Sequence, residues 1–158
     1  MGYQIYVKNV FPDGPCDPLE EHREKENYGC ISGKSLGMVP GVWAYAVDGY
    51  NAIDTAQTVR AWASDVHKCL DWIRECMDAG CTITLTDTNI IHAHAEDGSL
   101  MAYRVTQLVE HCYHCKRWSS EKWTPKEACW DLESEIEDLI MMAEWLEKNA
   151  GKEFDHSY

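Results

Sequence analysis

The residues best suited to chemistry form a run of histidines and cysteines in the second half of the chain. His111 and Cys115 are four positions apart, so on a helix they share a face and can bind one borderline metal ion together. His92 and His94 share a face if they belong to a strand. A transition-metal site, with zinc as the ion, is therefore one hypothesis. Its four predicted ligands are His92, His94, His111 and Cys115.

The spacing within this run argues against a single ion. If residues 101–118 are helical, the His and Cys side chains between positions 111 and 115 spread over roughly 160° of the helix surface. That range is too wide for one tetrahedral ion, and the spacing does not match a zinc motif built from two ligand pairs. A metal-binding protein or small metalloenzyme is therefore the alternative interpretation and not the leading one.

Cysteine-based catalysis is the second chemical possibility. It needs a thiolate beside a histidine that a third polar group orients. Cys16 and Cys30 lie in a predicted loop and are the more reactive candidates. The chain has no Gly-rich phosphate loop, G-x-S-x-G elbow or HExxH motif, so the sequence leans away from an enzyme. Other cysteines fall on or near apolar helix faces, which predicts core packing: Cys69, Cys76, Cys112 and Cys129.

The cysteine content also bears on the cellular compartment. The chain has eight cysteines, but it starts with neither a basic segment nor a long apolar run of the secretory type. No stretch approaches the ~18 apolar residues of a membrane span. We therefore expect a cytoplasmic protein whose cysteines are mostly reduced thiols in the core.

The far face of the predicted last helix is the third constellation. Trp and Met side chains there lie opposite the buried stripe, with carboxylates beside them, and aromatic residues and Met are enriched in protein interfaces. This pattern predicts a surface that binds a partner protein. The partner can also be a second copy of this chain, which would form a homodimer. The alternative is a helix packed on both faces within one domain. The predicted contact residues are Trp130, Glu133, Glu137, Met141, Glu144 and Trp145.

The charge of the chain limits its partners. Twenty-seven acidic residues against fourteen basic ones give a net charge of -13, which disfavours direct binding to nucleic acid or to a membrane surface. One segment, residues 116–126, alternates basic and aromatic residues in the manner of a nucleic-acid site, although it can also pair with the protein's own acidic helix. A protein partner with a basic surface fits the charge best.

The elements that must position these residues follow from periodicity and caps. Alternation of apolar and polar residues predicts strands at residues 3–8 and 41–47. It also predicts a hairpin formed by residues 81–86 and 90–95. Prolines and glycines predict a long irregular loop at about 11–40. Apolar spacing predicts a helix from Asp54 or Thr55 to about Ala79. Residues 100–118 fit either one helix or, as we prefer, a strand at 100–105 followed by a shorter helix. A capping box at Thr124 starts the last helix.

Together these features predict a single α+β domain over residues 1–158, with a mainly antiparallel sheet of four or five strands packed against two or three long helices. The expected function is that of a non-catalytic, acidic binding protein that engages a basic protein, a class that includes nucleic-acid-binding proteins. Small acidic proteins of this kind act as inhibitors or as immunity and anti-defence factors, including viral accessory proteins.

Overall fold

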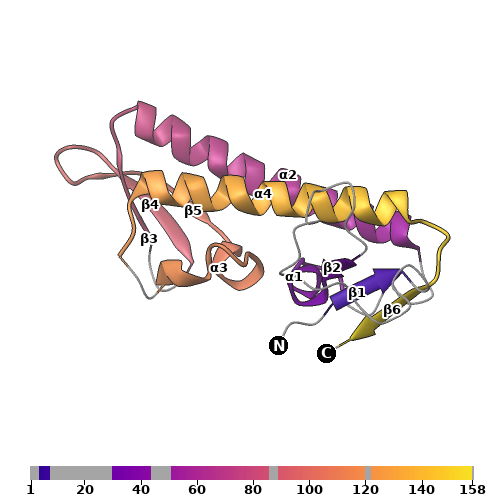
Figure 1. Ribbon diagram of the computed structural model, residues 1–158. Helices are drawn as coiled ribbons and strands as arrows, with labels where there is room; N and C mark the ends of the chain where they lie inside the picture. Colours follow the sequence, from indigo (N-terminus) through magenta and orange to yellow (C-terminus); the bar gives the residue numbers. More distant parts are fainter. Residues whose placement is uncertain (1–3, 8–29, 44–50, 86–88, 120–121, 158) are drawn as a thin grey trace. The chain divides into compact units, whose positions relative to one another are not determined.

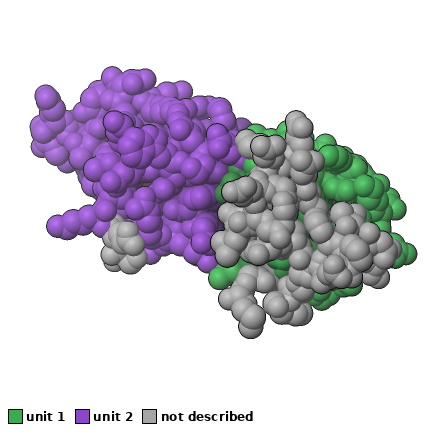
Figure 2. Space-filling view, viewed as in Figure 1, with its two compact units in different colours: residues 1–62, 138–158 green, residues 63–137 purple. Residues whose placement is uncertain are grey.

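The computed structural model describes residues 4–7, 30–43, 51–85, 89–119 and 122–157. These residues form an α+β structure with two long helices and six strands, as the class prediction required (Figure 1). The strands divide between two antiparallel sheets of three strands each, instead of the predicted single sheet of four or five. The chain separates into two compact units, residues 1–62 with 138–158 and residues 63–137 (Figure 2). The single-domain assignment stays a prediction.

The first unit contains the sheet β2-β1-β6. Its strands are β1 (Gln4–Val7), β2 (Cys30–Ser32) and β6 (Phe154–Ser157), and both outer strands run antiparallel to β1. Alternate β1 residues are buried, which is the pattern of a strand with one covered face. The expected opening strand is thus confirmed, whereas β2 and β6 were not predicted.

Part of the predicted loop at residues 11–40 has regular structure. After β2 comes the short helix α1 (Gly33–Gly37), which begins where the Ser32 hydroxyl accepts the Ser35 N–H at 3.2 Å. Residues 11–29 of that loop lie outside the described residues. Of the predicted strand at 41–47, residues 41–43 are not in a strand and the rest lie outside the described residues.

The helix α2 (Ala52–Asp78) matches its prediction to within a few residues at each end. Val59, Val66 and Ile73 on its apolar stripe are fully buried, as the spacing indicated. The helix is followed by Gly80, whose φ of 81° is the left-handed conformation that glycine adopts readily at a helix end.

The second unit contains the sheet β3-β4-β5, made of β3 (Thr82–Leu85), β4 (Ile90–His94) and β5 (Leu100–Val105). Residues 100–105 therefore form a strand and not the start of a long helix. The cause is the turn before it: the Asp97 carboxylate accepts the Ser99 N–H at 2.9 Å, and Gly98 has a φ of 85°. The helix that follows, α3 (Leu108–His111), is short, and the 3-10 turn η2 (Lys116–Ser119) comes after it.

The helix α4 (Pro125–Lys148) begins at the predicted capping box. The Thr124 N–H donates to the Glu127 carboxylate at 3.1 Å, and the Glu127 N–H donates to the Thr124 hydroxyl at 3.2 Å. The predicted stripe is confirmed, since Leu132, Leu139 and Leu146 are fully buried. Among the described helices, none is long and apolar enough to cross a membrane.

Candidate binding surface

The predicted metal ligands do not form a metal site. His92 and His94 lie on β4 with ring centroids 5.8 Å apart, His111 ends α3, and Cys115 is fully buried. Across residues 4–7, 30–43, 51–85, 89–119 and 122–157, no three His, Cys, Asp or Glu side chains are gathered closely enough to hold a metal ion. His92 and His94 belong to β4, whereas His111 and Cys115 lie in and after α3, so the strand β5 separates the two pairs along the chain.

Two of the described thiols, Cys69 and Cys115, are poorly suited to nucleophilic catalysis. Burial raises the pKa of Cys69 to about 11, and burial together with the adjacent Cys112 thiol raises the pKa of Cys115. A protonated thiol is a weak nucleophile at neutral pH. Cys30 is disulfide-bonded, so the expectation that it is a reactive thiol is wrong; Cys16 lies outside the described residues. The free cysteines are Cys69, Cys76, Cys81, Cys112, Cys115 and Cys129.

The predicted contact face of α4 falls into two parts, one in each unit. In the second unit, Trp130 is 56% exposed and Lys126 Nζ lies 5.3 Å from the centre of its ring. Glu133 pairs with Arg74 on α2, and Glu137 is exposed. Trp130 and Glu137 are therefore exposed as predicted. Glu133 already pairs with Arg74, and the Trp130 ring already contacts Lys126.

In the first unit the expectation of an exposed tryptophan is wrong. Trp145 is only 6% exposed, and its ring packs against Phe154 of β6 with centroids 5.5 Å apart. Met141 is half-buried and Glu144 is exposed. Here α4 is packed on both faces, because the unpredicted strand β6 covers the side opposite the leucine stripe.

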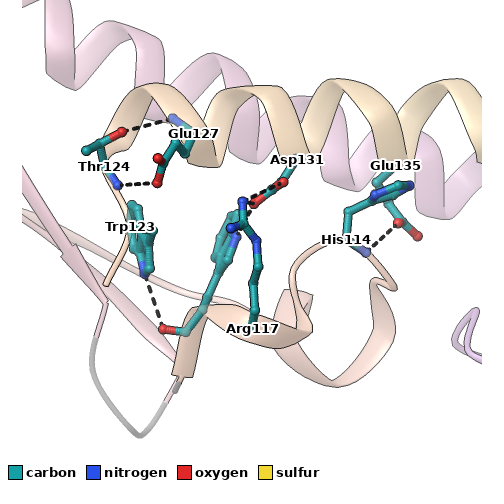
Figure 3. Close-up of polar contacts among 8 residues, drawn as sticks. His114, Arg117, Trp123, Thr124, Glu127, Asp131 and Glu135 are labelled. Carbon is teal, nitrogen blue, oxygen red and sulfur yellow. Dashed lines mark hydrogen bonds and ion pairs between the residues drawn. The ribbon is translucent and has the colours of Figure 1, made fainter. Parts of the chain in front are cut away.

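The basic and aromatic residues at 116–126 interact with the acidic helix α4 (Figure 3). Trp118 is buried and donates its indole N–H to Asp131 at 2.9 Å, and Arg117 binds the same carboxylate at 3.0 Å. The Trp123 indole N–H donates to the Trp118 carbonyl at 3.2 Å, with the rings stacked 5.2 Å apart. Arg117, Trp118 and Trp123 therefore help to hold this segment in the fold, and Arg117 and Trp118 do so by binding the protein's own acidic helix.

The outer face of the sheet β3-β4-β5 is a surface that the sequence reasoning missed. Met101, Tyr103 and Val105 of β5 are 63%, 63% and 68% exposed, whereas Ala102 and Arg104 between them are half-buried on the opposite face. We call this surface the β5 face. Its residues are Thr82, Thr84, Ile90, His92, His94, Leu100, Met101, Tyr103 and Val105.

The pairing register explains how these side chains come together. Tyr103 lies opposite His92, which lies opposite Thr84, so the three side chains form one cross-strand row. A register shift next to His94 leaves Met101 as an extra residue, and Leu100 beside it is also 53% exposed. None of the nine residues of the β5 face carries a carboxylate, in a chain with 27 acidic residues. The surface thus lacks carboxylates and combines the exposed apolar side chains of β5 with Thr and His side chains of β3 and β4.

No family model, curated protein or solved structure matches this chain. The function must therefore be argued from the surface itself.

Proposed function

We propose that this chain is a non-catalytic binding protein that engages a basic protein partner through the β5 face. Such a protein would act as an inhibitor or as an immunity or anti-defence factor, by covering a functional surface of its partner. The proposal places it in the cytoplasm because six cysteines among the described residues are free thiols. The disulfide at Cys30 is of a type more frequent in oxidising compartments.

The observation that carries the proposal is the exposure of Met101, Tyr103 and Val105, each about two-thirds exposed on one strand. Fully burying a side chain of this size is worth roughly 1.5–3 kcal/mol relative to leaving it in water. Exposed apolar residues in contact with one another usually mark a surface that another molecule covers. Covering the β5 face with a partner would therefore be favourable.

The basic character of the partner follows from charge. A molecule with a net charge of -13 attracts a basic surface over distances longer than the contact itself. Two exposed carboxylates, Glu96 and Asp97, lie in the turn between β4 and β5 at one end of the face. Hydrogen bonds from Ser99 lower the pKa of Asp97, which keeps that carboxylate ionised. An apolar centre with an acidic edge suits a partner that surrounds an apolar contact with Lys or Arg.

Display selection with a random peptide library tests this proposal. Peptides of about ten residues, which is long enough for one strand, are displayed on yeast and sorted for binding to the full chain at low ionic strength. We expect the recovered peptides to combine Lys or Arg with apolar residues. Their affinity should fall as NaCl rises from about 0.05 to 0.5 M, because salt screens exposed charges. Recovery of neutral or acidic peptides only, or of peptides insensitive to salt, would remove the basic partner from the proposal.

Two variants decide which surface the peptides contact. The double variant Met101→Thr/Val105→Thr introduces threonine, a good strand former, and leaves the net charge unchanged while it removes apolar area. It should bind the peptides about tenfold more weakly, which corresponds to about 1.4 kcal/mol. Trp130→Ala, which removes a comparably exposed side chain from α4, should bind as the wild type does. The opposite pattern would assign binding to α4.

A further inference from the structure

We propose that the free edge of β5 binds an extended, basic segment of the partner as an added fourth strand of the sheet β3-β4-β5. This inference rests on the proposed function and specifies how the partner binds. It follows from the direction of the β5 backbone groups, from the composition of the strand and from the difference between the two edges of the sheet.

The hydrogen-bond pattern shows which β5 backbone groups point away from β4. The Thr106 N–H donates to the Asn89 carbonyl at 2.8 Å, which identifies these two residues as a hydrogen-bonded pair. Hydrogen-bonded and non-hydrogen-bonded pairs alternate along an antiparallel ladder. Val105 opposite Ile90 and Tyr103 opposite His92 are therefore non-hydrogen-bonded pairs. The N–H and C=O groups of Tyr103 and Val105 point to the free edge.

The side chains of β5 leave this edge open to another strand. Natural edge strands are usually protected by Lys, by Pro or by charged side chains that disfavour pairing. The strand Leu100–Val105 contains no Lys and no Pro, and its one charged residue, Arg104, lies on the half-buried face. The register shift next to His94 falls at the Leu100 end, so Tyr103 and Val105 lie in the regularly paired part of the strand. An incoming strand would place its own side chains next to Tyr103 and Val105, so it would bury the apolar residues that carry the proposed function.

The opposite edge of the sheet differs from the β5 edge. A pocket of about 500 Å³ borders β3, and its other wall is formed by residues of the 118–123 segment, including Trp118 and Trp123. The β3 edge thus has a neighbouring chain segment that would obstruct an added strand. Within the described part of the chain, β5 pairs with β4 alone.

Charge favours an extended basic segment over a second copy of this chain. Pairing β5 with β5 of another copy would bring together two molecules that each carry a net charge of -13. A segment whose Lys or Arg residues lie at the end beside the turn would instead place its basic side chains near the turn carboxylates Glu96 and Asp97, while its apolar side chains cover the β5 face. Concentration-dependent dimerisation through β5 would overturn this assignment.

A matched pair of variants separates the backbone contact from the side-chain contact. Tyr103→Ala and Tyr103→Pro both remove the tyrosine side chain, but only Tyr103→Pro also removes the N–H that faces the free edge. Proline is tolerated at such edge positions because its missing N–H is not part of the existing ladder. Peptides recovered by the display selection should bind Tyr103→Pro at least about fivefold more weakly than Tyr103→Ala, the effect of one lost hydrogen bond.

Amide hydrogen exchange measured by NMR on the wild-type chain provides a second test, which needs no substitution. Without peptide, the amides of Tyr103 and Val105 should exchange quickly and those of Ala102 and Arg104 slowly, because only the latter bond to β4. The recovered peptide should slow exchange at Tyr103 and Val105. Equal peptide affinity of the two Tyr103 variants, with no added protection of these amides, would overturn edge pairing but leave the proposed function intact. Failure to recover basic peptides would overturn both.

Discussion

Trp130 and Trp145 lie on the same helix, α4, but differ in how far they are exposed to solvent. Trp130 is 56% exposed, whereas Trp145 is 6% exposed and packs against Phe154. On a helical wheel both lie opposite the buried stripe. The wheel could not show that β6, which follows the helix in the chain, covers one of them. The angle of a side chain on a helix is a local property, but its burial depends on the rest of the fold.

The stability of single variants should reflect this difference. Trp145→Ala should lower the free energy of unfolding by about 3–5 kcal/mol, as is usual when a large buried aromatic side chain is removed. Trp130→Ala should change it by less than about 1 kcal/mol, since surface substitutions rarely do more. Denaturant unfolding followed by circular dichroism measures both. Similar losses for the two variants would show that Trp130 is also covered.

The buried thiols should make stability fall at high pH. Burial raises the pKa of Cys69 from 9.0 to about 11. Below pH 9 the thiol is protonated in both the folded and the unfolded chain, so its contribution is fully present. Between pH 9 and 11 the unfolded chain ionises first, and the free energy of unfolding should fall by about 2–3 kcal/mol from this group.

Cys69→Ala provides the comparison for that pH dependence. The variant should be less stable than the wild type at pH 8 but should lose less stability between pH 9 and 11, because the titrating group is gone. Urea unfolding at several pH values measures both slopes, and groups that titrate in both proteins cancel in the difference. Identical slopes would mean that Cys69 ionises equally in the folded and unfolded chains.

At the scale of elements, the parts of the fold that the sequence predicted are those with local signals. The capping box at Thr124 and the glycine at position 80 mark helix ends through contacts within a few residues. In contrast, β6 was missed because Phe154 is its only strong strand former, and its pairing is with β1 from the other end of the chain. Pairing between such distant segments leaves little trace in a local pattern.

The β5 face was missed for a different reason. Alternation along Met101–Val105 predicts a strand with two different faces, and it would place the apolar residues inward and Arg104 outward. The structure has the reverse arrangement, with Met101, Tyr103 and Val105 outward. Pattern alone therefore identified the strand but not the face that the helices cover, and the candidate site became apparent only with the structure.

The two kinds of position on β5 should respond differently to proline. Ala102 directs its N–H to β4, so Ala102→Pro removes a ladder bond and should destabilise the chain by about 3 kcal/mol or more. Tyr103→Pro should cost no more than about 1 kcal/mol relative to Tyr103→Ala, because its N–H points to the free edge. Thermal unfolding of the three variants measures this. Equal destabilisation by the two prolines would contradict the assigned direction of the backbone groups.

At the scale of the whole molecule, the boundary between the two compact units falls inside α2 and inside α4. Helix formation is cooperative along a continuous segment. We therefore predict that the chain unfolds in one transition, as a single domain would. Calorimetry and denaturant unfolding followed by two probes test this, and two separated transitions would show that the units are independent domains.

The central claim is that an acidic, non-catalytic chain binds a basic segment on the β5 face. The most direct test is an NMR titration of the isotope-labelled full chain with a basic peptide from the display selection. The account predicts that the amide shifts change in Ile90–His94 and Leu100–Val105 and that the changes weaken with added salt. Changes confined to α4 around Trp130, or independent of salt, would contradict it.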